Sequence, residues 1–96
     1  MHVITRKRLR EFAARHPDSA RPLDTWFHVV DKAQWSSFAE VRQTFRSVDV
    51  VGRHTVFNVK DDIRIITTVD YEWRKVFIKY VLTHAEYDRG RWKQES

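Results

Sequence analysis

The spacing of the apolar residues changes once along this chain, close to residue 50, and that change limits what the chain can fold into. Before it, apolar residues recur at the three- and four-residue spacing of an amphipathic helix. After it, runs of β-branched and aromatic residues are separated by connections of hairpin length, which is typical of consecutive antiparallel strands. The pattern predicts an α+β fold in which helices pack on one face of a small antiparallel sheet.

The first half of the chain is expected to hold two to three N-terminal helices. In the first, Leu9 and Phe12 belong to an apolar stripe, and Pro17 ends the helix because proline cannot continue one. The same spacing predicts a second helix from about residue 19 to residue 32. A short third helix is expected to start at Ser37, the serine of a capping-box pattern. The aromatic residues expected in the core are Trp26, Phe27, Trp35 and Phe45.

The second half is expected to form a C-terminal three-stranded meander. Its strands are predicted at residues 55–59, 63–71 and 75–83, and residues 2–5 are a further candidate that would extend the sheet. Because side chains alternate across a strand, Arg64 and Lys79 are predicted to share the face away from the helices. In the last strand, the same alternation predicts Val81 on the side of Lys79 and Tyr80 on the opposite side.

The charge of the chain favours a polyanionic partner. Its 96 residues suit a single domain, 1–96, with one modest core. Eighteen Lys and Arg residues against thirteen Asp and Glu residues give a net charge of +5, which attracts nucleic acid first and an acidic protein second. The excess lies near the two ends of the chain, at Arg6, Lys7, Arg8, Arg10, Arg15, Arg89, Arg91 and Lys93.

Several classes of function find no support in the sequence. There is no cysteine, so neither a disulfide framework nor a thiolate metal site is available. The five histidines are scattered without the helical spacing of a zinc site, and no glycine-rich phosphate loop is present. No apolar run approaches the length of a membrane span. We therefore expect a cytoplasmic protein with no metal, small-molecule cofactor or membrane partner.

The residues after the last predicted strand have the side chains that RNA cleavage requires, because His84, Tyr87 and Asp88 follow it closely. When the 2′-hydroxyl of RNA attacks the neighbouring phosphorus, a base removes its proton, a cation stabilises the developing charge and an acid protonates the departing 5′-oxygen. Histidine suits either proton transfer, and arginine binds two phosphate oxygens with its planar fork. The composition permits this chemistry without a metal.

Each of these residues also has a purely structural interpretation. His84 could cap the turn after a strand, and Tyr87 could be a packing aromatic. Arg64 could be a solvated strand residue, and Asn58 could bond to a neighbouring turn. For His54 the structural interpretation is favoured over a place beside the site. The basic first helix is either a contact surface for RNA or a solvated face that keeps the protein soluble.

Several motifs, taken in order, resemble the HigB family of toxins from bacterial type II toxin-antitoxin modules, within the RelE/ParE group. They are the opening M-x-V-I, the tryptophan at position 26, W-x-S-F-A-E-V at 35–41, VFN at 56–58, an arginine that opens the middle strand, and TH-x-EYD at 83–88. The resemblance covers nearly the whole chain, and the last motif is the most specific.

The resemblance implies a RelE-like fold and an mRNA endoribonuclease (mRNA interferase), often acting on the ribosome and inhibited by a cognate helix-turn-helix antitoxin of the HigA type. It implies that His84 and Tyr87 transfer protons, that Arg64 stabilises the phosphate and that Asp88 orients one of the pair. Contacts to RNA are expected from Lys79, Asn58, Arg6, Lys7, Arg10, Arg89 and Arg91.

One departure from the family pattern and two alternative functions remain. The family usually has a Gly-Asn turn followed by Tyr-Arg, whereas here Asp61, Asp62 and Ile63 precede Arg64. Because the carboxylates of Asp61 and Asp62 repel RNA phosphates, this turn is less expected to contact RNA. A ParE-like toxin would inhibit gyrase without cleaving RNA. A non-catalytic nucleic-acid-binding module would stack bases on its aromatic residues.

Overall fold

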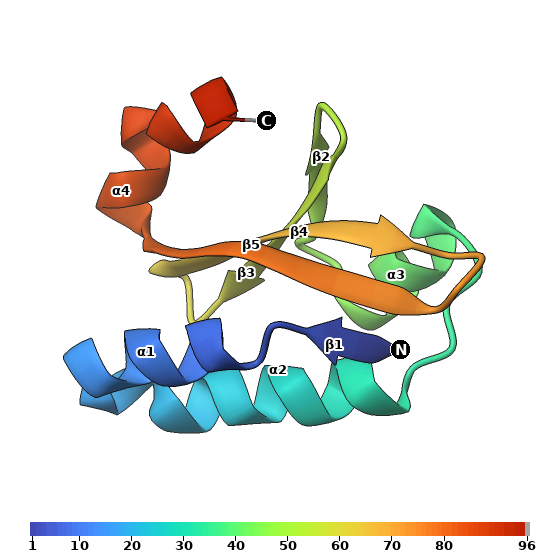
Figure 1. Cartoon of the computed structure of the whole chain (residues 1–96), viewed down its shortest axis with the longest axis horizontal. Coiled ribbons are helices and arrows are strands. Elements are labelled where there is room, and N and C mark those ends of the chain that lie inside the picture. The colour runs from blue at the N-terminus through green and yellow to red at the C-terminus, as the bar shows by residue number, and fades with distance from the viewer. Residues whose placement is uncertain (96) are drawn as a thin grey trace.

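A five-stranded sheet forms the centre of the fold in the computed structural model, which describes residues 1–95 and the side chains of residues 1–93 (Figure 1). Its strands are β1 (His2–Ile4), β2 (Asp49–Val51), β3 (His54–Val59), β4 (Ile63–Asp70) and β5 (Lys75–Thr83). In space they follow the order β1-β5-β4-β3-β2. Strands β2 to β5 pair antiparallel, whereas β1 runs parallel to β5. The sheet is therefore mixed.

Helices cover one face of this sheet. Helices α1 (Lys7–Arg15) and α2 (Ala20–Lys32) lie side by side beneath it, joined by the 3-10 turn Pro17–Ser19, and α3 (Phe38–Thr44) precedes β2 (Figure 1). On the other side of the sheet lie α4 (His84–Arg89) and the 3-10 segment Arg91–Glu95, and β2 projects toward the same side (Figure 1). Among the described residues, no helix is long and apolar enough to cross a membrane.

The main core lies between the helices and the sheet. Phe57 of β3 is its centre, because three aromatic rings surround it: Trp26 and Phe45 meet it edge-on at centroid distances of 5.3 and 5.2 Å, and Trp35 stacks at 6.2 Å. Phe12 adds a side chain that is 1% exposed. Aromatic side chains bury large areas, so these rings supply much of the apolar burial in a chain of this size.

A second, smaller apolar cluster lies on the opposite face of the sheet. Val56 and Ile66 are its buried strand residues, and Trp92 from the C-terminal 3-10 segment covers them. Tyr80 and Tyr87 pack against this cluster. This outer cluster fastens the C-terminal part of the chain to the sheet, and it contains no residue of α1 or α2 among the described residues.

The α+β class, the helices on the sheet and the C-terminal meander confirm the expectations from the sequence. Strict alternation in β5 is wrong, because Ile66 pairs with Tyr80 while Thr67 pairs with Ile78, which leaves Lys79 in a bulge. A bulge residue reverses the alternation after it. Tyr80 therefore joins the outer cluster, and Val81 is buried in the helix-side core rather than on the side of Lys79.

Three further features differ from the sequence-based expectation. The parallel pairing of β1 replaces a purely antiparallel sheet, because helices α1 and α2 connect it to the rest of the sheet and such long connections allow parallel pairs. Strand β2 was not expected; two of its three residues are exposed, so it lacks the alternation of buried and exposed side chains that marks a half-buried strand. Helix α4 was not expected because none of its residues is fully buried, so it lacks the apolar stripe that marks the other helices.

Candidate active site

The junction between β5 and α4 fixes the position of His84. Thr83 ends the strand and caps the helix: its hydroxyl accepts from the Glu86 N–H at 3.2 Å, and the Glu86 carboxylate accepts from the Thr83 N–H at 2.9 Å. This capping box makes His84 the first residue of α4. The His84 N–H also donates to the Asp62 carbonyl at 2.8 Å, which ties the helix to the β3–β4 turn.

Arg64 reaches His84 from the neighbouring strand. Its Nη2 lies 3.0 Å from Nδ1 of His84, while its Nη1 donates to the carbonyls of Asp61 at 2.9 Å and Ile63 at 3.2 Å. Because a guanidinium has donors only, Nδ1 of His84 is the acceptor in this contact. The imidazole proton then lies on Nε2, which faces Oδ2 of Asp88 at 3.1 Å. Arg64, His84 and Asp88 therefore form one chain of contacts.

Tyr87 completes the cluster. The guanidinium carbon of Arg64 lies 5.7 Å from the centre of the Tyr87 ring. Burial raises the pKa of the Tyr87 phenol above its ordinary value of 10.0, and the negative charge of Asp49 adds to the increase although Arg64 opposes it. A phenol is protonated at neutral pH even at its ordinary pKa, and the environment of Tyr87 favours the protonated form further, so its O–H is available as a hydrogen-bond donor.

Trp92 packs behind the cluster, a position that was not predicted from the sequence. Its side chain is 3% exposed, its ring stacks on Tyr87 at 5.3 Å, and its Nε1–H donates to the Tyr87 carbonyl at 3.2 Å. Helix α4 has no fully buried residue of its own, and its Tyr87 packs against the outer cluster through Trp92. The available signal was Gly90, whose φ of 71° ends α4 and lets the chain turn back.

His54 is a buried residue that packs against Trp92 and, within residues 1–93, forms no hydrogen bond or ion pair with the cluster around His84. It is buried at the start of β3, and its ring meets Trp92 edge-on at 5.6 Å. Burial lowers the pKa of His54 below its ordinary value of 6.5, and the nearby charges of Arg53 and Lys79 lower it further. A neutral histidine under Trp92 is consistent with the structural interpretation.

The residues predicted to contact RNA are spread over two sides of the molecule. Asn58 pairs with Arg64 across the sheet, but its side-chain amide donates to the Ser47 carbonyl at 2.9 Å. Lys79 is exposed at the bulge. The exposed Arg89 and Arg91 lie with α4 on the side of His84, whereas Arg6, Lys7 and Arg10 belong to the α1 region beneath the sheet (Figure 1).

Arg6 also has partners of its own on the helical side. Its guanidinium lies 3.9 Å from the centre of the Phe27 ring and 3.7 Å from Asp24. The structure therefore brings together Arg64, His84, Tyr87 and Asp88 but leaves the basic side chains of Arg6, Lys7 and Arg10 apart from them. Within residues 1–93, no three His, Asp or Glu side chains gather as metal ligands would.

Comparison with known proteins assigns the chain to a family. Residues 19–90 match the family described as the RelE-like toxic component of a toxin-antitoxin system. The chain belongs to the HigB toxin family. The matched span includes Arg64 and the whole of α4, and it ends before Trp92.

Similar proteins extend this likeness to almost the full chain. The mRNA interferase toxin HigB of Escherichia coli K12 is 32% identical over 92 residues, which cover 92% of this chain and 88% of that protein. The mRNA interferase HigB of Shigella flexneri gives the same values. That of Escherichia coli O6:H1 is 27% identical over 93 residues, covering 93% of this chain and 90% of that protein.

Proposed function

We propose that this HigB-family chain is the toxin of a type II toxin-antitoxin module and that it acts as an mRNA interferase, an endoribonuclease that cleaves mRNA. The family and the names of the similar proteins support the class of activity. The observation that carries the proposal is the chain of contacts from Arg64 through His84 to Asp88. It joins a phosphate-binding cation to a proton-transfer group whose orientation is fixed.

The proposed reaction needs no redox step and no added reactant. The 2′-oxygen of the RNA forms a bond to the adjacent phosphorus as His84 takes the hydroxyl proton on Nδ1, and the bond from phosphorus to the 5′-oxygen breaks. The products are a 2′,3′-cyclic phosphate and a 5′-hydroxyl. Asp88, 3.1 Å from Nε2, stabilises the imidazolium that forms.

Arg64 and Tyr87 act on the phosphate side of this reaction. When a phosphodiester binds, Arg64 turns its guanidinium from His84 to two nonbridging oxygens, which frees Nδ1 to receive the proton. The pKa of the Tyr87 phenol lies above its ordinary value of 10.0, so the phenol carries its proton at neutral pH. It lies beside Arg64, with the guanidinium carbon 5.7 Å from its ring centre, so it is the donor for the departing 5′-oxygen.

The partners follow from charge and family. The net charge of +5 attracts RNA at long range. We propose that the toxin cleaves mRNA on the ribosome, in the cytoplasm, and that Arg89 and Arg91 beside α4 contact the RNA backbone. A cognate helix-turn-helix antitoxin of the HigA type would lay an acidic segment over this positive surface and block access to His84.

The test compares His84→Gln with the wild type after induction in cells, with mRNA 5′ ends mapped. The matched control is His28→Gln on α2, an exposed histidine on the helical side of the sheet. Growth arrest and new 5′-hydroxyl ends are expected from the wild type and the control but not from His84→Gln. DNA damage signalling with intact mRNA would instead favour the gyrase-inhibiting alternative.

A further inference from the structure

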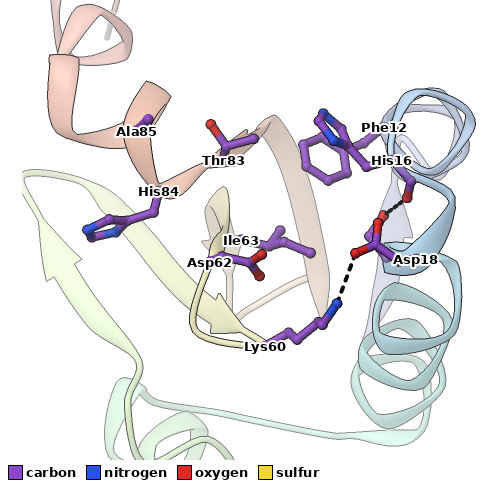
Figure 2. Close-up of a pocket in the computed structure, with 10 residues that line it drawn as sticks. Phe12, His16, Asp18, Lys60, Asp62, Ile63, Thr83, His84 and Ala85 are labelled. Atoms are coloured by element: carbon purple, nitrogen blue, oxygen red, sulfur yellow. Dashed lines mark hydrogen bonds and ion pairs between the residues drawn. The ribbon is translucent and has the colours of Figure 1, made fainter.

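A cavity of about 230 Å³ adjoins the proposed active site, and the mechanism above does not use it. It lies where the β3–β4 turn and the start of α4 face the end of α1 (Figure 2). Its lining includes Phe12, His16, Asp18, Lys60, Asp62 and His84. His84 therefore borders both the cavity and the contact with Arg64.

One side of the cavity is aromatic. The rings of His16 and Phe12 stack with a centroid distance of 4.4 Å and an interplanar angle of 28°. Phe12 is 1% exposed and holds its partner from the core side, whereas His16 is only partly buried. In Figure 2 these two rings lie on one side of the cavity, with Asp62 and Ile63 across from them. Phe12 therefore holds the His16 ring in place, and the exposed part of that ring is available for stacking with another ring.

The other side carries one unbalanced carboxylate. Lys60 Nζ and Asp18 Oδ2 form an ion pair of 3.1 Å at the rim, and Lys60 lowers the pKa of the Asp18 carboxyl. Asp62 lies between Lys60 and His84 along the cavity (Figure 2). Within residues 1–93, its carboxylate has no ion-pair partner. The cavity therefore offers hydrogen-bond acceptors beside a stacking surface.

We propose that this cavity binds one base of the RNA, next to the phosphate that is cleaved; this inference rests on the proposed function. A carboxylate repels a phosphate but accepts hydrogen bonds from the exocyclic amino group of a base, as Asp and Glu do with cytosine. Unstacked RNA bases stack on aromatic side chains, including histidine, and the partly exposed ring of His16 is available for such stacking. The volume lies below the roughly 300 Å³ at which pockets for drug-sized ligands begin, so it suits a single base.

This arrangement gives the RNA two attachment points around His84. Arg64 would hold the phosphate on the sheet side, and the cavity would hold a flanking base on the side of α1. A base with an amino group, such as cytosine, is preferred there, and uracil, which has none, is disfavoured. The carboxylate of Asp62 in the β3–β4 turn then favours a base with an amino group, even though it repels the phosphates of the RNA backbone.

The experiment measures cleavage, in the presence of ribosomes, of short mRNAs that differ only in cytosine or uracil at each position flanking the cleaved bond. The wild type is compared with Asp62→Asn, His16→Ala and the control Glu72→Gln, which makes the same charge change in the turn between β4 and β5. Thermal melting of each variant verifies folding.

At one flanking position, the wild type and Glu72→Gln should favour cytosine by about tenfold, the value of a hydrogen bond to a charged group. Asp62→Asn should abolish that preference. His16→Ala should slow cleavage of both mRNAs by about tenfold, the value of one stacked base.

If His84→Gln abolishes cleavage while Asp62→Asn and His16→Ala keep the wild-type rate and preference, the base site is wrong and the proposed function stands. Absence of cleavage by the wild type overturns both. Weakened antitoxin binding by these two variants, with unchanged RNA preference, would assign the cavity to a protein side chain and also overturn the base site.

Discussion

The guanidinium of Arg64 lies 3.0 Å from the imidazole of His84, although the two residues are 20 positions apart in the chain. The antiparallel pairing of β4 with β5 brings them together, because Arg64 lies opposite Leu82 and the capping box places His84 at the start of α4. A cation and a proton-transfer group thus meet where β5 ends and α4 begins.

Replacing Arg64 with lysine should remove most cleavage while leaving the fold intact. Lysine keeps the positive charge but loses the planar fork that binds two phosphate oxygens. We expect the rate to fall about 100-fold or more, as when one preorganised donor is lost from a site, with an unchanged melting temperature. Arg42→Lys on α3 is the control, and a rate equal to the wild type for Arg64→Lys would show that charge alone suffices.

Tyr87→Phe separates the phenol from the ring. The ring stack on Trp92 remains, so the free energy of unfolding should stay close to that of the wild type. Cleavage should fall by about 100-fold or more because the proton donor is lost. Single-turnover rates and urea unfolding of the same preparations measure the two effects. Undiminished cleavage by Tyr87→Phe would remove the phenol from the mechanism.

Trp92 should be essential for the position of α4. Trp92→Ala leaves a cavity under the helix and should lower the free energy of unfolding by about 3 to 5 kcal/mol, with loss of cleavage. Trp92→Phe keeps a ring beside Tyr87, so it should lower both the free energy of unfolding and the cleavage rate by less than Trp92→Ala does. Trp73→Ala is the control because Trp73 is 68% exposed. Urea unfolding tests this, and equal effects at both tryptophans would contradict it.

The stability of the protein should fall as the pH decreases below about 6.5, because burial lowers the pKa of His54 in the folded state. The unfolded chain takes up this proton first, so stability is lost as the pH falls from the unfolded pKa through the folded one. Melting temperatures between pH 7.5 and 5 measure the effect. His54→Phe should flatten this dependence, and a slope equal to that of the wild type would assign it to another group.

The sequence was sufficient for the helices and the meander because each has a strong apolar period and a short connection. The side of the sheet on which Arg64 lies could be predicted from its position in β4. The close spacing of His84, Tyr87 and Asp88 along the chain indicated that their side chains could act together. That these three lie on a helix was missed because α4 is stabilised by a cap and by Trp92 rather than by an apolar stripe.

Other features depend on tertiary contacts that sequence patterns do not record. The bulge at Lys79 shifts the register within β5, and no glycine or proline marks it. The direction of β1 is set by its contact with Lys75–Phe77 at the sheet edge. The contact of Trp92 with His54 joins residues far apart in the chain, so the support behind Tyr87 became visible only in the folded structure.

The most direct test of an attacking 2′-hydroxyl is cleavage, in the presence of ribosomes, of a short mRNA that carries a single 2′-deoxy nucleotide on the 5′ side of the cleaved bond. The unmodified RNA should give a 2′,3′-cyclic phosphate and a 5′-hydroxyl, and the substituted RNA should remain intact at that bond while other sites are cut. Cleavage at the substituted position, at the rate of the unmodified RNA, would contradict the mechanism built on Arg64, His84 and Tyr87.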